Sequence, residues 1–132
     1  MTKFVPSQIR REFRCEDEEQ AAIFDWAALA EARLPELRLL FASANGGYRP
    51  KATGAKLKRM GVRAGIPDLC LPVPRDPYHG LWIELKVGDN TPTPQQLRWI
   101  DDLNGQGYCA VVCYGADEAI RVIEAYLMGK AW

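Results

Sequence analysis

Hydrophobic positions recur along the chain with two spacings, one typical of helices and one typical of strands. Segments with helical spacing or helix-type ends predict helices at 16–34, 53–60, 93–105 and 117–127. Segments that alternate, or that are apolar throughout, predict strands at 37–44, 66–73, 82–88 and 108–114. The order helix, strand, helix, two strands, helix, strand, helix indicates an α/β domain with a mixed sheet flanked by helices.

The connections refine this sheet. The turn-rich stretch 72–80 predicts a hairpin between the second and third strands. The last strand, "YCAVVCY" at 108–114, is apolar almost throughout, which is typical of a central strand buried on both faces.

Two predicted helices have well-marked ends. Acidic residues crowd the first turn of the helix that begins at Glu16, where the helix dipole favours them, and Pro35 ends it. Thr93 can cap the later helix, Pro94 suits its first position, and Gln96 completes a Thr-x-x-Gln capping box. The helix residues expected to face the core are Ile23, Trp26, Ala27, Ala30, Leu97, Ile100 and Leu103.

Length and composition indicate one domain. The 132 residues, 48% of them hydrophobic, can fill a single core, and we expect residues 16–132 to form it after an N-terminal arm, residues 1–15. No apolar run resembles a signal peptide or a membrane span, so we expect a cytoplasmic protein with no membrane partner. The four cysteines show no zinc-ligand spacing with the single histidine, His79, which we interpret as structural.

Charge is zero overall but unevenly distributed. Between Glu36 and Asp68 every charged residue is Lys or Arg. Such segregation predicts a basic surface for DNA or RNA, and a merely solvated helix face is the alternative interpretation. The residues expected to contact nucleic acid are Arg49, Lys51, Lys56, Lys58, Arg59 and Arg63.

The stretch "WIELKVG" places two charged side chains on one face of a strand. Glu84 and Lys86 lie two residues apart, roughly 6.6 Å along the chain. The predicted hairpin can bring Asp68 beside Glu84, and two such carboxylates suit Mg²⁺ or Mn²⁺. An adjacent lysine can position water and offset charge on a phosphate. An ordinary surface ion pair is the alternative interpretation.

The sequence on either side of these residues favours the metal site over the surface ion pair. "GIPD" and "IELK" match the PD-(D/E)xK nuclease motif, and "NGG", "GVRAGIPDLCLPV", "YHGLWIELK" and "TPTPQQ" surround it. Together they resemble the virus-type replication-repair nuclease (VRR-NUC) domain, in its small stand-alone form typical of phages and prophages. The resemblance extends from about Glu16 to Leu127 and implies a restriction-endonuclease-like core.

The resemblance also implies roles for particular residues. Asp68, Glu84 and the backbone carbonyl of Leu85 would bind the metal ion, and Lys86 would be the catalytic lysine. Glu16, with Gln20 four residues later, fits the acidic position of the first helix, although Glu19 is an alternative. Gln96 would support the site, which does not exclude its capping role.

We therefore expect a Mg²⁺- or Mn²⁺-dependent DNA endonuclease without a small-molecule cofactor. By analogy with small phage members of the family, we expect a homodimer that cuts branched DNA such as Holliday junctions inside a bacterial host. A non-catalytic nucleic-acid-binding or assembly module and a sequence-specific restriction-type nuclease are the alternatives.

Overall fold

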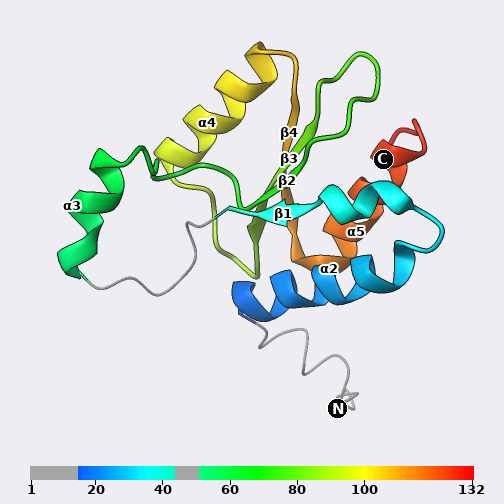
Figure 1. Cartoon of the computed structure of the whole chain (residues 1–132), viewed down its shortest axis with the longest axis horizontal. Helices are drawn as coiled ribbons and strands as arrows, with labels where there is room; N and C mark the ends of the chain where they lie inside the picture. The colour runs from blue at the N-terminus through cyan, green and yellow to red at the C-terminus, as the bar shows by residue number, and fades with distance from the viewer. Residues whose placement is uncertain (1–14, 44–50) are drawn as a thin grey trace.

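The structure, a computed structural model, describes residues 15–43 and 51–132, with the backbone alone for 51–53. Four strands form one sheet in the order β1-β2-β3-β4 (Figure 1). They are β1 Phe41–Ala42, β2 Leu69–Leu71, β3 Leu81–Lys86 and β4 Cys109–Tyr114. The first three pair antiparallel, whereas β3 and β4 pair parallel. The predicted mixed sheet and its central hairpin are confirmed.

Helices cover both sides of this sheet. Helices α2 (Glu16–Ala30) and α5 (Gly115–Leu127) lie together on one side, and α4 (Pro94–Gly105) lies on the other (Figure 1). The predicted capping box of α4 is present, because Gln96 N–H donates to Thr93 Oγ1 and Thr93 N–H donates to Gln96 Oε1. The first turn of α2 holds four acidic residues, as expected for the positive end of a helix dipole.

Strand β3 lies at the centre of the core. Leu81, Ile83 and Leu85 are each 1% exposed and belong to the same cluster as the fully buried Ile23 of α2 and Ile123 of α5. Burying such a side chain contributes about 1.5–3 kcal/mol, so this face of the strand is strongly fixed. Since side chains alternate along a strand, the intervening residues of β3 must point to the opposite face.

The prediction of a strand at 37–44 is wrong for the first half of that range. Residues Pro35–Leu39 form a 3-10 helix, η1, and β1 begins only at Phe41. Pro35 stands at the start of η1, where its fixed φ angle and missing N–H suit a helical turn. Leu37 is buried as expected, but from a helical turn.

Two other expectations also need correction. Within the described residues, β4 is an edge strand of the sheet, and its apolar run is explained by α4 and α5, which both contact it. Leu97 is 46% exposed because it lies in the first turn of α4, whereas Ile100 one turn later is buried.

Helix α3 (Lys51–Arg59) stands apart from the other elements at the left of Figure 1. It corresponds to the predicted basic helix and ends near Gly61, whose φ is +97°. In the described parts of the chain, no helix is both long and apolar enough to cross a membrane.

Candidate active site

The hairpin brings Asp68 and Glu84 to the open end of β2 and β3. Leu69 pairs with Ile83, so one step further along the antiparallel register Asp68 lies beside Glu84. Asp68 Oδ2 accepts a hydrogen bond from the backbone N–H of Leu85 at 2.8 Å. Its carbonyl accepts another from the N–H of Ser43 at 2.7 Å, which ties the residue to the end of β1 as well.

Glu84 is buried, but hydrogen bonds from the described residues do not satisfy both of its carboxylate oxygens. The side chain is 1% exposed, and its Oε2 has no hydrogen-bond partner within the described residues. Burial, and then the charge of Asp68, raise the pKa of Glu84 to about 8. Burial likewise raises the pKa of Asp68, although the hydrogen bond from Leu85 acts in the opposite direction. A buried carboxylate pair of this kind favours either a proton or a cation between its members.

Lys86 supplies the nearest positive charge. Its Nζ lies 3.6 Å from Glu84 Oε1 and 3.8 Å from Glu16 Oε1, and the residue is only 8% exposed. Glu16 is the first residue of α2, so this lysine connects the sheet to the start of that helix. The sequence prediction that Asp68, Glu84 and Lys86 come together, with Glu16 next to them, agrees with this geometry.

The structure gives Glu16 and Glu19 different surroundings. Glu19 is buried, and its Oε1 accepts a hydrogen bond from the N–H of Ala116 at 3.4 Å, at the start of α5. There the positive end of the helix dipole favours a carboxylate. Glu16, one turn earlier, faces Lys86 instead, which makes it the better candidate for the acidic residue of the first helix.

Two features of the site were missed in the sequence. Asp17 is near enough for its negative charge to add to the raised pKa of Asp68, after the larger effect of burial. The contact of Glu19 with α5 was missed too, because it joins residues 97 positions apart and no local pattern signals it. Gln96 lies in the capping box that was the alternative interpretation, and its role in the site stays a prediction.

The donors present fit a small, hard cation that keeps part of its water shell. In the described residues, no group of three or more His, Cys, Asp or Glu side chains is arranged to hold a metal ion. Asp68 and Glu84 nevertheless offer carboxylate oxygens, one of them the buried Oε2 of Glu84, which no described residue hydrogen-bonds. Mg²⁺ is bound in proteins by one or two carboxylates together with waters and substrate oxygens. The residues therefore suit Mg²⁺ or Mn²⁺ better than zinc.

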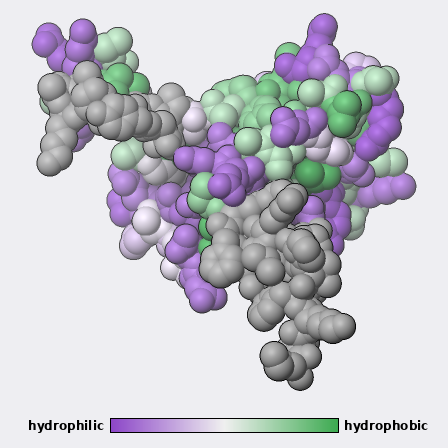
Figure 2. Space-filling model, turned by 90° about the horizontal axis from the view of Figure 1, so that it is seen from below, coloured by the Kyte–Doolittle hydropathy of each residue, from purple (hydrophilic) through white to green (hydrophobic). Residues whose placement is uncertain are grey.

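The basic residues expected to contact nucleic acid lie on and beside α3. Arg49 lies outside the described residues, and for Lys51 only the backbone is described. The others are all exposed, and these are Lys56, Lys58, Arg59 and Arg63. Helix α3 forms the knob at the left of Figure 2, where hydrophilic and hydrophobic residues lie side by side. The basic segment thus projects from the domain as a separate surface.

A groove of about 790 Å³ runs between α3 and α4. Leu57 and Val62 line one wall, and Gln95 and Trp99 of α4 line the other. Trp99 Nε1 donates to the carbonyl of Ala64 at 3.1 Å, which fastens the chain after α3 to α4. Asp68 follows Ala64 by four residues, so this wall of the groove is close along the chain to the carboxylate pair.

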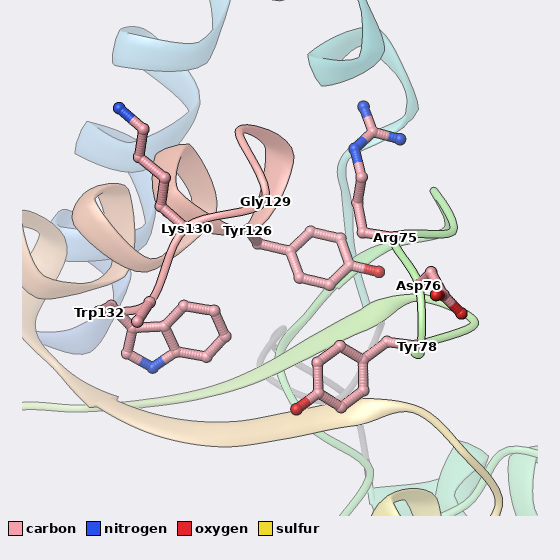
Figure 3. A pocket seen from close by; sticks show the side chains of 8 residues that line it. Arg75, Asp76, Tyr78, Tyr126, Gly129, Lys130 and Trp132 are labelled. Carbon is pink, nitrogen blue, oxygen red and sulfur yellow. The ribbon is translucent and has the colours of Figure 1, made fainter.

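A second hollow, of about 380 Å³, lies at the hairpin end of the sheet (Figure 3). Tyr78, Tyr126 and Trp132 line it. The guanidinium of Arg75 is engaged with the carbonyls of Leu127 and Pro74, so it holds the hairpin against the end of α5. This hollow is at the opposite end of β3 from Lys86.

His79 lies at that same hairpin end. Its backbone N–H donates to the carbonyl of Gly107. Its ring packs edge-on against that of Tyr108, with 5.5 Å between the ring centroids. The interpretation of His79 as structural fits these contacts, which are remote along the strand from Glu84.

Comparison with known proteins agrees with this geometry. Residues 6–117 match the family model of the VRR-NUC domain. A solved structure described as a "VRR_NUC domain protein" is 38% identical, with a TM-score of 0.70, and the match covers 87% of this chain and 89% of that one. The comparison with curated proteins gives no match. A match of this extent implies a nuclease-type function with DNA as substrate. The chain belongs to the VRR-NUC domain family.

Proposed function

We propose that the protein is a Mg²⁺- or Mn²⁺-dependent DNA endonuclease. The observation that carries this proposal is the buried Oε2 of Glu84, which lacks a partner in the described residues while Asp68 and Lys86 lie next to it. A purely structural ion pair would not need a second, half-buried carboxylate beside a buried one, because removing a charge from water costs several kcal/mol.

Asp68, Glu84 and the carbonyl of Leu85 would hold the ion, with Glu16 at the edge of the site. When bound, such an ion polarises a phosphoryl oxygen and lowers the pKa of a coordinated water. Lys86 would donate hydrogen bonds to the attacking water and offset negative charge on the phosphate. The water oxygen would bond to phosphorus and lose a proton to solvent, one phosphorus–oxygen ester bond would break, and the departing oxygen would take up a proton from solvent.

The substrate in this proposal is branched DNA. The exposed cations on and beside α3 would contact backbone phosphates, which fixes position without reading sequence. A homodimer would suit a four-way junction, because both have two-fold symmetry or come close to it. The branched substrate and the homodimer rest on analogy with small members of the family.

The test is incubation of the purified protein with labelled four-way junction, flap and linear duplex DNA, in Mg²⁺, Mn²⁺ or EDTA. Lys86→Ala and Glu84→Gln should abolish cleavage while DNA binding in EDTA persists. Lys130→Ala, which removes an exposed lysine at the far end of the sheet, is the matched control and should cut normally.

Binding without cuts under either metal would replace the enzyme with an assembly module. Cuts at one defined sequence in linear duplex would indicate a restriction-type nuclease instead. A preference for the junction, measured with all three substrates at the same concentration, would support the branched substrate.

A further inference from the structure

The groove between α3 and α4 combines three properties that a nucleic-acid strand requires. Its rim carries the exposed cations of Lys58 and Arg63. Its walls include the apolar side chains of Leu57 and Val62 and the indole of Trp99. Cations beside an aromatic surface are the usual composition of sites for unpaired nucleotides, since phosphates contact the cations and a base stacks on the ring.

The segment after α3 packs against α4 and leads along the chain to Asp68. Trp99 Nε1 bonds to Ala64, and Gly65 lies so close to α4 that a Cβ there would come within 2.8 Å of the Gln95 side chain. Pro67, which is almost fully buried, then leads to Asp68. Only residues 65–67 separate Ala64, which lines the groove, from Asp68, so the groove is close along the chain to the carboxylate pair.

The volume of the groove fits this occupant. Its volume of about 790 Å³ falls within the range of small-ligand sites, so it has room for a nucleotide-sized group. Among the described residues that line the groove, Asp102 is acidic, and Lys58 and Arg63 are cationic. The charge therefore favours a phosphate backbone.

We infer that this groove binds an unpaired nucleotide segment of the DNA strand, next to the cleaved phosphate, with Trp99 as the stacking surface. Unpaired nucleotides occur where a branch leaves a duplex, so the groove selects branched DNA over continuous duplex. This inference rests on the proposed nuclease function for its meaning, but its binding step needs neither metal nor cleavage.

The experiment measures DNA binding in EDTA by fluorescence anisotropy. Two labelled probes share one duplex, and one of them carries a single-stranded flap. The wild-type chain should bind the flapped probe about tenfold more tightly than the plain duplex, as expected for the stacking of one base. The double variant Lys58→Ala/Arg63→Ala should lose most of this preference, and the matched variant Arg38→Ala/Lys130→Ala should keep it.

A crosslink gives a second, independent measurement. The flap carries 5-bromouracil, and after irradiation the crosslinked peptide is identified by mass spectrometry. Crosslinking to Trp99 or Leu57 supports the inference, whereas crosslinking to Trp82 or Trp132 overturns it. Equal affinity of the wild-type chain for both probes, or an unchanged preference in Lys58→Ala/Arg63→Ala, overturns it as well.

The two proposals fail in different ways. If the protein cuts DNA but shows no flap preference in EDTA, the groove inference fails and the nuclease stands. If the flap crosslinks to Trp99 but no metal produces cleavage, the nuclease fails and the groove remains a binding site for unpaired DNA.

Discussion

Lys86 Nζ lies 3.6 Å from Oε1 of Glu84, and both side chains are almost completely removed from solvent. The ammonium offsets part of the negative charge that Asp68 and Glu84 bring together, but Oε2 of Glu84 has no hydrogen-bond partner among the described residues. The second oxygen, Oε2, is left for another partner. The arrangement is therefore electrostatically incomplete without a cation, a proton or a substrate.

Replacing Lys86 by Ala should reduce cleavage by about 100-fold or more, as loss of a positioned group that stabilises charge does in other enzymes. Above about pH 8, where Glu84 loses its proton, the same change leaves the buried carboxylate without its cation, so the melting temperature should fall in metal-free buffer. Thermal denaturation and single-turnover cleavage measure the two effects. Unchanged cleavage would remove Lys86 from the mechanism, and Lys130→Ala is the control for loss of a lysine.

Metal-free stability should fall as pH rises between about 5 and 8. The pKa of Glu84 is raised from 4.5 to about 8 in the folded protein, so in this interval the unfolded chain has released a proton that the folded chain retains. Linkage then makes the free energy of unfolding decrease with pH. Chemical denaturation in EDTA at several pH values measures the slope.

Glu84→Gln should remove most of that slope, because the amide does not titrate. It should also make the metal-free protein more stable than the wild type at pH 8 while abolishing cleavage. A wild-type slope that persists in Glu84→Gln would assign the titration to another group.

Glu16→Ala and Glu19→Ala should have opposite consequences. Glu19 is buried and bonds to Ala116, so its loss should cost about 1–2 kcal/mol of unfolding free energy. Glu16 is partly exposed and pairs with Lys86 at 3.8 Å, so its loss should cost under about 1 kcal/mol yet reduce cleavage. Urea denaturation and cleavage assays on both variants measure this. A cleavage defect confined to Glu19→Ala at full stability would reverse the assignment.

Gly65→Ala should destabilise the protein more than Gly88→Ala. Both glycines have positive φ angles, +85° and +56°, which an alanine adopts at a cost of about 1 kcal/mol. Only at Gly65 would the added methyl meet a neighbour, the Gln95 side chain at 2.8 Å. If urea denaturation shows the same loss of unfolding free energy for both variants, the Gln95 side chain moves aside at Gly65 with no energetic penalty.

Local patterns predicted most of the fold. The capping box of α4, the hairpin of β2 and β3 and the buried alternation of Leu81, Ile83 and Leu85 depend on neighbouring residues, and all were predictable. The edge position of β4 was not, because helices on both faces can bury an edge strand as thoroughly as a central one. Element boundaries near Pro35 were also missed, since an apolar run fits both a 3-10 turn and a strand.

The part of the candidate site that lies on the β2–β3 hairpin was predictable from the sequence. Asp68, Glu84 and Lys86 are brought together by one hairpin, which the sequence marks clearly. The distinction between Glu16 and Glu19 required the tertiary structure, because it depends on which residue meets α5. Asp17 was missed for the same reason.

The hydrogen bond from Leu85 N–H to the side chain of Asp68 makes this carboxylate a rung of the sheet. The pairing of β2 with β3 therefore sets the distance between the carboxylates of Asp68 and Glu84. Glutamate at position 68, longer by one methylene, could not keep both that rung and the same spacing. Insertions in the connection 72–80, by contrast, would fall at the far end of the hairpin and leave the spacing intact. Insertions and deletions can therefore be tolerated in the connection 72–80, but not at the end of β2 and β3 that holds Asp68 and Glu84.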